Sequence, residues 1–305
     1  MKIGLMTSQQ FAVNTFNHLR KVYKDLELIT ITPEEAKKNS VSGYFDFKNL
    51  CKKTNISYNS LSTYSLKEEV DFIKISKLNL DILCVIGWNR IIPKEILNLL
   101  KIGAIGSHSS PGILPLGRGR SPVVWGIKLG FSQIYNQLFK LTEGIDDGDI
   151  LAINRINIDL SDDIDFVYKK IAFSQVCIID SAIKNLINNK KIDIKGENLD
   201  LLLPKRTKEN AKIDWHLSAY DIHNLIRAVS PTYHGASFKY KDNNFEAFKS
   251  KIWDMQLDDK KECPGKILSV IGETLIVQCG RGYLAILEHS LDIDEEILSK
   301  DSFLC

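Results

Sequence analysis

Over the first two hundred residues, short apolar runs alternate with amphipathic stretches, and this order constrains the fold most. Residues 2–7 predict a strand, apolar residues between 11 and 23 recur at helical spacing, and residues 26–31 predict a second strand. Residues 81–86 are apolar after Asp81, as in a strand buried on both faces. Because neighbouring parallel strands need a crossover segment, we expect an α/β fold with a doubly wound, mainly parallel sheet.

The remaining elements of this segment follow from the same patterns. Helices are predicted over residues 44–53, 66–75, 92–101, 122–129 with Ser121 as N-cap, and 163–188, and strands over residues 104–107, 133–141 and 150–158. A polar join over residues 188–198 leads to a helix over 218–229 and to β-type runs at 236–240, 266–270 and 274–277. We therefore expect an α/β domain over residues 1–200 and a smaller, mainly β domain over residues 201–305.

Composition narrows the class of partner. The 305-residue chain has 40 Lys and Arg against 38 Asp and Glu, so its net charge favours neither nucleic acid nor an anionic membrane. Six cysteines form no C-x-x-C pair, as is usual for reduced thiols in the cytosol. The N-terminus turns polar after a few residues, and no run approaches ~18 apolar residues. We expect a cytoplasmic protein that acts on a small molecule.

Reactive groups gather in residues 106–119. His108 follows a short predicted strand, and in open α/β sheets ligands bind beyond the carboxyl ends of the strands. Histidine can take up and release a proton near neutral pH, which acyl transfer to an amine requires. The alternative is a structural loop histidine.

An acidic loop over residues 143–149 offers a partner for this histidine. A hydrogen bond from His108 to Asp146 would orient the ring and stabilise its protonated form. The alternatives are a solvated turn or a metal loop, although the D-x-D-G spacing of calcium loops is not met.

Together these elements resemble the 10-formyltetrahydrofolate-dependent formyltransferases, which include methionyl-tRNA formyltransferase and the sugar N-formyltransferases. The matching elements occur in the family's order over most of the chain. They are Gly87-Trp-Asn-Arg-Ile-Ile-Pro93, His108 with Leu114-Pro115, Arg118-Gly-Arg-Ser-Pro122, Trp125, Gly144-Ile-Asp-Asp-Gly-Asp-Ile150, Arg206, Ile213-Asp-Trp215, Ile222, Asn224, Ile226-Arg-Ala228, Pro231 and Tyr233-His-Gly-Ala236.

The resemblance implies a Rossmann-like formyltransferase domain and a catalytic Asn, His and Asp. His108 and Asp146 take two of these positions, whereas Gly106 stands where the family has asparagine. In the family that amide stabilises the oxyanion that forms when the amine adds to the formyl carbon. Loss of such a donor costs about 3–4 kcal/mol of transition-state stabilisation. Four substitutes stay open: a backbone N–H near Gly106, the Ser107 hydroxyl, Asn89, or protonated His108.

The resemblance also implies where the co-substrate and the acceptor bind. The folate site would use Trp88, Asn89, Arg90 and Ile91, largely through backbone and apolar contacts, with Gly144 and Ile145 as the opposing wall. Ser110 and Arg118 would contact the acceptor substrate. The stretch from His108 to Pro115 is about two residues longer than the family's usual spacing, and no metal is required.

The acceptor follows from charge and motif. Residues 201–305 contain 14 Lys and Arg against 16 Asp and Glu, whereas a domain that grips RNA should be basic. The motifs at 118–122 and 233–236 resemble the sugar branch. We therefore expect formyl transfer to a nucleotide-linked amino sugar (dTDP-, GDP- or UDP-linked) for a surface polysaccharide such as lipopolysaccharide O-antigen. Methionyl-tRNA formylation, hydrolysis of the folate, and non-catalytic binding stay open, as do a homodimer and the role of the β domain.

Overall fold

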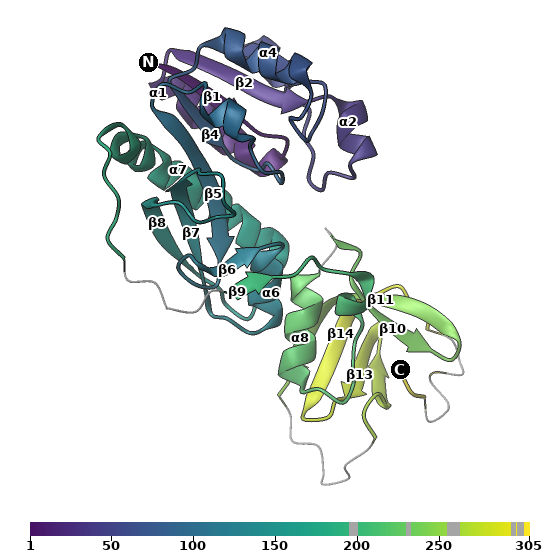
Figure 1. Ribbon diagram of the computed structural model, residues 1–305. Coiled ribbons are helices and arrows are strands. Elements are labelled where there is room, and N and C mark those ends of the chain that lie inside the picture. The colour runs from purple at the N-terminus through teal and green to yellow at the C-terminus, as the bar shows by residue number, and fades with distance from the viewer. Residues whose placement is uncertain (195–200, 230–232, 255–262, 294–296, 298–301) are drawn as a thin grey trace. The chain divides into compact units, whose positions relative to one another are not determined.

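The computed structural model describes residues 1–305 except 195–200, 230–232, 255–262, 294–296 and 298–301, and the side chains of residues 201 and 202 (Figure 1). The chain forms two compact units. Unit 1 comprises residues 1–119, 135–156 and 168–202, and unit 2 comprises residues 120–134, 157–167 and 203–305. Part of the expected join, residues 195–198, lies outside the described residues.

A seven-stranded sheet in the order β3-β2-β1-β4-β5-β7-β8 organises unit 1 (Figure 1). The strands from β3 through β5 pair in parallel, and β7 pairs antiparallel with β5. The strands are β1 (Lys2–Met6), β2 (Asp25–Ile31), β3 (Ser57–Leu61), β4 (Ile82–Val85), β5 (Gly103–Ser110), β7 (Gln133–Lys140) and β8 (Ile150–Asn157). The expected doubly wound, mainly parallel sheet is confirmed.

Helices follow most of these strands. They are η1 (Gln10–Ala12), α1 (Val13–Val22), α2 (Pro33–Lys38), α3 (Lys48–Thr54), α4 (Glu69–Leu78), α5 (Lys94–Leu97) and α7 (Ile164–Ile187). The start of α2 shows the local cause, because the Thr32 hydroxyl accepts from the Glu35 N–H at 3.2 Å and Pro33 opens the first turn.

Apolar side chains cover both faces of this sheet. On one face, Ile3, Leu5, Cys84 and Ile105 pack with residues of α1, α3 and α7. On the other face, Met6, Leu83, Val85 and Ala104 pack with residues of α2, α4 and α5. The alternation along β5 therefore places Gly106 and His108 on the second face, with Ala104.

Two expectations need correction near the site. The helix expected over residues 92–101 is only the short α5, and the strand expected over 104–107 extends to Ser110. His108 thus lies within β5, because residues 107–110 pair with β7. Ser121 does not cap α6 (Pro122–Lys128) through its side chain and has a left-handed φ of 55°.

Unit 2 contains a separate five-stranded sheet in the order β10-β11-β14-β13-β12. Neighbouring strands of this sheet pair antiparallel, and the strands are β10 (Ala236–Tyr240), β11 (Asn243–Trp253), β12 (Ile267–Ile271), β13 (Thr274–Gln278) and β14 (Tyr283–His289). Helix α8 (Ala219–Ala228) begins at Ser218, whose hydroxyl accepts from the Asp221 N–H, and packs against β11 and α6. The mainly β second domain is confirmed. Three further short elements occur in the described residues, η2 (Lys208–Ala211) and the paired strands β6 (Leu116–Gly119) and β9 (Leu201–Leu203).

A buried histidine makes unit 2 sensitive to acid. His223 lies between the Ser250 hydroxyl and the Leu160 carbonyl, both 2.9 Å from a ring nitrogen, and its burial lowers its pKa below the ordinary 6.5. Below pH 6.5, His223 therefore binds a proton in the unfolded chain but stays neutral in the folded chain until the pH is lower. The free energy of unfolding falls as pH falls. One such group contributes at most about 1.4 kcal/mol per pH unit.

We expect a His223→Gln variant to lose less stability than the unsubstituted protein between pH 7.5 and pH 5.5. Denaturant unfolding at both pH values measures this difference. A His216→Gln variant is the matched control, because His216 is exposed in the same unit. An equal pH dependence in all three proteins would contradict the assignment.

Candidate active site

His108 lies on β5, two residues beyond Gly106, the last residue of β5 that pairs with β4. Its side chain is only 8% exposed. Nδ1 lies 3.3 Å from Oδ2 of Asp146, and Nε2 lies 2.9 Å from the Gly117 carbonyl oxygen. The structure therefore brings together the predicted histidine and the predicted aspartate.

The loop that presents Asp146 connects β7 to β8. Asp146 has a left-handed backbone with φ of 49°. The loop is held on both sides, because Glu143 pairs with Lys94 at 2.7 Å and Arg118 donates to the Ile145 carbonyl at 3.1 Å. These contacts place the carboxylate of Asp146 against the ring of His108.

Both neighbours of the His108 ring are hydrogen-bond acceptors, a carboxylate and a carbonyl. A neutral imidazole has one donor nitrogen and one acceptor nitrogen, whereas the imidazolium donates from both. A neutral ring can donate to one of these two acceptors, and a ring that has accepted a proton from a substrate donates to both. This arrangement suits a general base that receives a proton from an attacking amine.

The Gly106 position is closed by apolar side chains. A Cβ built there would lie 2.7 Å from Cδ2 of Leu141 and 2.8 Å from Cζ of Phe139. The space that an asparagine side chain needs is therefore filled by two residues from β7 and its end. Ser107 lies on the opposite face of the strand, where its hydroxyl donates to Gln175 at 2.8 Å, so it faces away from His108.

We expect a Gly106→Asn variant to lose stability and not to gain activity. Overpacking of a buried position costs about 1–3 kcal/mol, which denaturant unfolding measures. Adding Leu141→Ala should recover part of that loss, because it frees the space. Gly43→Asn is the control, since nothing lies within 4 Å of its Cβ position and asparagine tolerates left-handed backbone. A higher formyl-transfer rate in Gly106→Asn would instead show that a missing amide limits the reaction.

The two predicted substrate contacts differ in access. Ser110 is fully buried, and its hydroxyl donates to the Gly112 carbonyl at 2.7 Å. This burial contradicts the expectation that Ser110 touches a substrate, because its hydroxyl is occupied inside the protein. Arg118 is half-buried beside the Asp146 loop, where it contacts the Ile145 carbonyl.

The residues expected to bind folate fall into two groups. Trp88 is buried and packs edge-on to Tyr64, with ring centroids 4.7 Å apart. The guanidinium carbon of Arg90 lies over the ring of Tyr64, 4.8 Å from its centroid. Asn89, Ile91, Gly144 and Ile145 are exposed. The side chains of Ile91 and Ile145 are 59% and 47% exposed, and the Lys94–Glu143 ion pair ties their two segments together.

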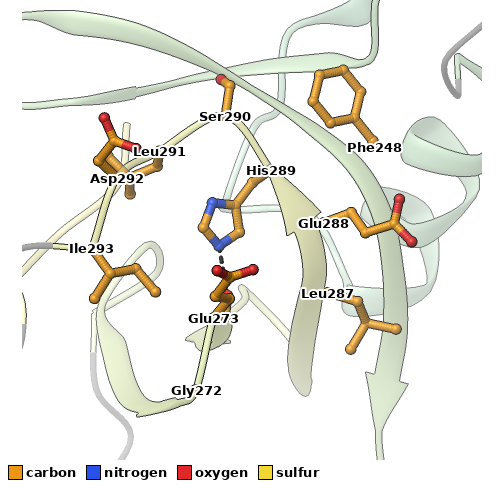
Figure 2. Close-up of a pocket in the computed structure, with 10 residues that line it drawn as sticks. All are labelled: Phe248, Gly272, Glu273, Leu287, Glu288, His289, Ser290, Leu291, Asp292 and Ile293. Atoms are coloured by element: carbon orange, nitrogen blue, oxygen red, sulfur yellow. Dashed lines mark hydrogen bonds between the residues drawn. The ribbon is translucent and has the colours of Figure 1, made fainter.

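One cavity lies far along the chain from these residues. Figure 2 shows the hollow of about 680 Å³ in unit 2, where His289 contacts the Glu273 carbonyl among residues of β14 and its following loop. It contains neither His108 nor Asp146. Within the described ranges, no cluster of His, Cys, Asp or Glu has the makings of a metal site, and no helix is long and apolar enough to span a membrane.

Comparison with known families decides the class of the protein. The formyl transferase model matches residues 7–183, and the model of the formyl transferase C-terminal domain matches residues 205–304. The chain belongs to the formyl transferase family. The resemblance drawn from the motifs is thereby confirmed, and this formyltransferase is an enzyme of a class that transfers formyl groups.

Individual relatives of this formyltransferase include both branches. Methionyl-tRNA formyltransferase of Clostridium botulinum is 28% identical over 287 residues, covering 94% of this chain and 90% of that protein. The solved structure of WlaRD, a sugar 3N-formyl transferase with dTDP and 5-N-formyl-THF, has a TM-score of 0.70 at 18% identity and covers 96% of this chain and 99% of that chain. The N-formyltransferase of Helicobacter canadensis, solved with folinic acid and dTDP-3-aminofucose, has a TM-score of 0.67 at 16% identity and covers 94% and 98%.

Two residues of the site escaped the analysis of the sequence. The Gly117 carbonyl meets His108, and Gln137 of β7 pairs with His108 across the strands. The available signal was the lengthened spacing from His108 to Pro115, which indicates an altered turn but not its partners.

Proposed function

We propose that this enzyme transfers the formyl group of 10-formyltetrahydrofolate to the amine of a nucleotide-linked amino-deoxy sugar. The observation that carries the chemistry is the buried His108 held between Asp146 and the Gly117 carbonyl. The exposed Ile91 and Ile145 support a folate ring beside it, with Gly144 and the backbone of Trp88, Asn89 and Arg90 in the adjoining segments.

The reaction needs one proton to move as one bond replaces another. The amine nitrogen bonds to the formyl carbon, His108 accepts the proton that the amine loses, and Asp146 stabilises the resulting imidazolium. The bond from the formyl carbon to the folate nitrogen then breaks, and His108 returns the proton to that nitrogen. Because Gly106 has no side chain, donation to the oxyanion falls to a backbone N–H, to protonated His108 or to Asn89.

Charge supports a sugar acceptor. Residues 201–305 contain 14 Lys and Arg against 16 Asp and Glu, so the second domain lacks the excess of positive charge that an RNA backbone demands. Two structural neighbours were solved with dTDP or a dTDP-linked amino sugar. The surface-polysaccharide destination of the product, the cytoplasmic location and a homodimer belong to the same proposal.

Methionyl-tRNA formylation is the second candidate. It is favoured by relatives named methionyl-tRNA formyltransferase, which are 24–29% identical to this chain over at least 94% of its length. Folate binding and the roles of His108 and Asp146 are common to both candidates.

A mass-spectrometric assay separates these candidates. The enzyme is incubated with 10-formyltetrahydrofolate and, in parallel, a panel of nucleotide-linked amino sugars, charged initiator tRNA, or no acceptor. A gain of one formyl mass on a sugar supports the proposal. Formylation of tRNA alone overturns the acceptor, and formate release without an acceptor indicates a hydrolase.

A further inference from the structure

Gln137 is the residue of β7 that pairs with the catalytic histidine of β5. In the antiparallel pairing of β5 with β7, Gln137 stands opposite His108, so both side chains lie on the same face of the sheet. The side chain of Gln137 is fully buried. A buried amide is costly unless its polar atoms are paired, so its partners report its function.

The partners of Gln137 all belong to one turn, residues 110–114. Its Oε1 accepts from the Leu114 N–H at 2.8 Å, and its Nε2 donates to the Ser110 hydroxyl at 3.2 Å and to the Gly112 carbonyl at 3.1 Å. This turn is the part of the chain that lengthens the spacing from His108 to Pro115. One amide side chain thus holds it at three points.

Residues 110–114 also support Gly117, whose carbonyl oxygen contacts His108. Gly117 has φ of 78°, and a Cβ built there would lie 2.8 Å from Cβ of Ser110, so its backbone rests directly on that residue. The Gly117 carbonyl oxygen lies 2.9 Å from Nε2 of His108. Contacts therefore run without a gap from Gln137 through Ser110 and Gly117 to the ring.

We propose that Gln137 is a positioning residue that fixes the turn 110–114, and through it sets the Gly117 carbonyl and the ring of His108 on the side where the acceptor amine binds. The inference rests on the proposed function in taking His108 as the base. An attacking amine must approach the ring nitrogen that Asp146 does not hold, which is Nε2 beside Gly117. The turn therefore governs the acceptor side and not the folate side.

The first test compares two buried amides on neighbouring residues of β7. Gln137→Met keeps the shape of the side chain and removes its three bonds to the turn. Asn136→Leu is the matched control, because Asn136 is also fully buried but faces the other side of the sheet, where it contacts Ser109 and Ser174. Gln137→Glu, which keeps the acceptor for the Leu114 N–H, serves if the Met variant does not fold.

With an acceptor found in the assay above, we expect Gln137→Met to lower kcat/KM for the acceptor about 10- to 100-fold. The KM for 10-formyltetrahydrofolate should stay within about twofold, because the substitution removes no contact to the folate. Gln137→Glu should retain part of the activity. The proposal would be overturned if Gln137→Met and Asn136→Leu lost equal amounts of kcat/KM for the acceptor. It would also be overturned if this kcat/KM were unchanged in Gln137→Met.

A second readout does not need turnover. The ¹⁵N signals of the two ring nitrogens of His108, assigned by their loss in His108→Asn, report the surroundings of Nδ1 beside Asp146 and of Nε2 beside Gly117 in NMR spectra. We expect the Nε2 signal to shift in Gln137→Met and to persist at its original position in Asn136→Leu. A persistent signal in Gln137→Met refutes the positioning role even if no acceptor is ever formylated, whereas absent turnover in the unsubstituted enzyme refutes only the proposed function.

Discussion

A His108→Asn variant is expected to lose formyl transfer by about 10²- to 10⁴-fold, the usual contribution of a general base. The asparagine side chain does not take up a proton at neutral pH, so the attacking amine keeps its proton and the addition product reverts. Binding of the folate should survive, because the exposed residues expected to contact it, Ile91 and Ile145, are unchanged. Initial rates by mass spectrometry and folate titration by calorimetry measure the two quantities.

The chain offers a matched control for this substitution. His18 also pairs with an aspartate, since its Nε2 lies 2.7 Å from Oδ2 of Asp180, but it lies on α1. A His18→Asn variant should transfer formyl groups at nearly the original rate. Retention of more than about a tenth of the activity in His108→Asn would remove His108 from the role of base.

An Asp146→Asn variant is expected to lose up to about 10⁴-fold in kcat, the loss that follows when the aspartate behind a catalytic histidine becomes an amide. The neutral amide no longer stabilises the imidazolium, and its NH₂ group competes with the ring as donor. The free energy of unfolding should change little, because the carboxylate lies in a loop and is partly exposed. Transfer rates and denaturant unfolding check both statements.

Asp147→Asn separates this effect from a general loss of negative charge. Asp147 is the next residue of the same loop, is exposed and bonds to the Thr142 hydroxyl. The Asp147→Asn substitution removes the same charge without touching His108. The formyl-transfer rate of this variant should therefore stay within about threefold of the original, in line with the small effect of an exposed charge. If both variants lost activity equally, the role of Asp146 would reduce to local electrostatics.

Local apolar patterns in the sequence predicted much of the fold. The apolar runs that became β1, β2 and β4 were predicted because each buries its side chains on both faces of a parallel sheet. Strand β3 was missed, since its sequence Ser-Tyr-Asn-Ser-Leu is mostly polar and only its pairing with β2 makes it a strand. The same holds for β11, a long polar strand between β10 and β14.

The sequence by itself determined the alternating α/β pattern of the first domain, the family and the residues His108 and Asp146, because these depend on local apolar patterns and on motifs that occur in the family's order. Only the tertiary structure decided that Phe139 and Leu141 fill the place beside Gly106, that Ser110 is inaccessible, and that Gln137 holds the turn. The physical reason is the register of β5 against β7. Pairing of strands about thirty residues apart selects which side chains share a face, and no local pattern contains that choice.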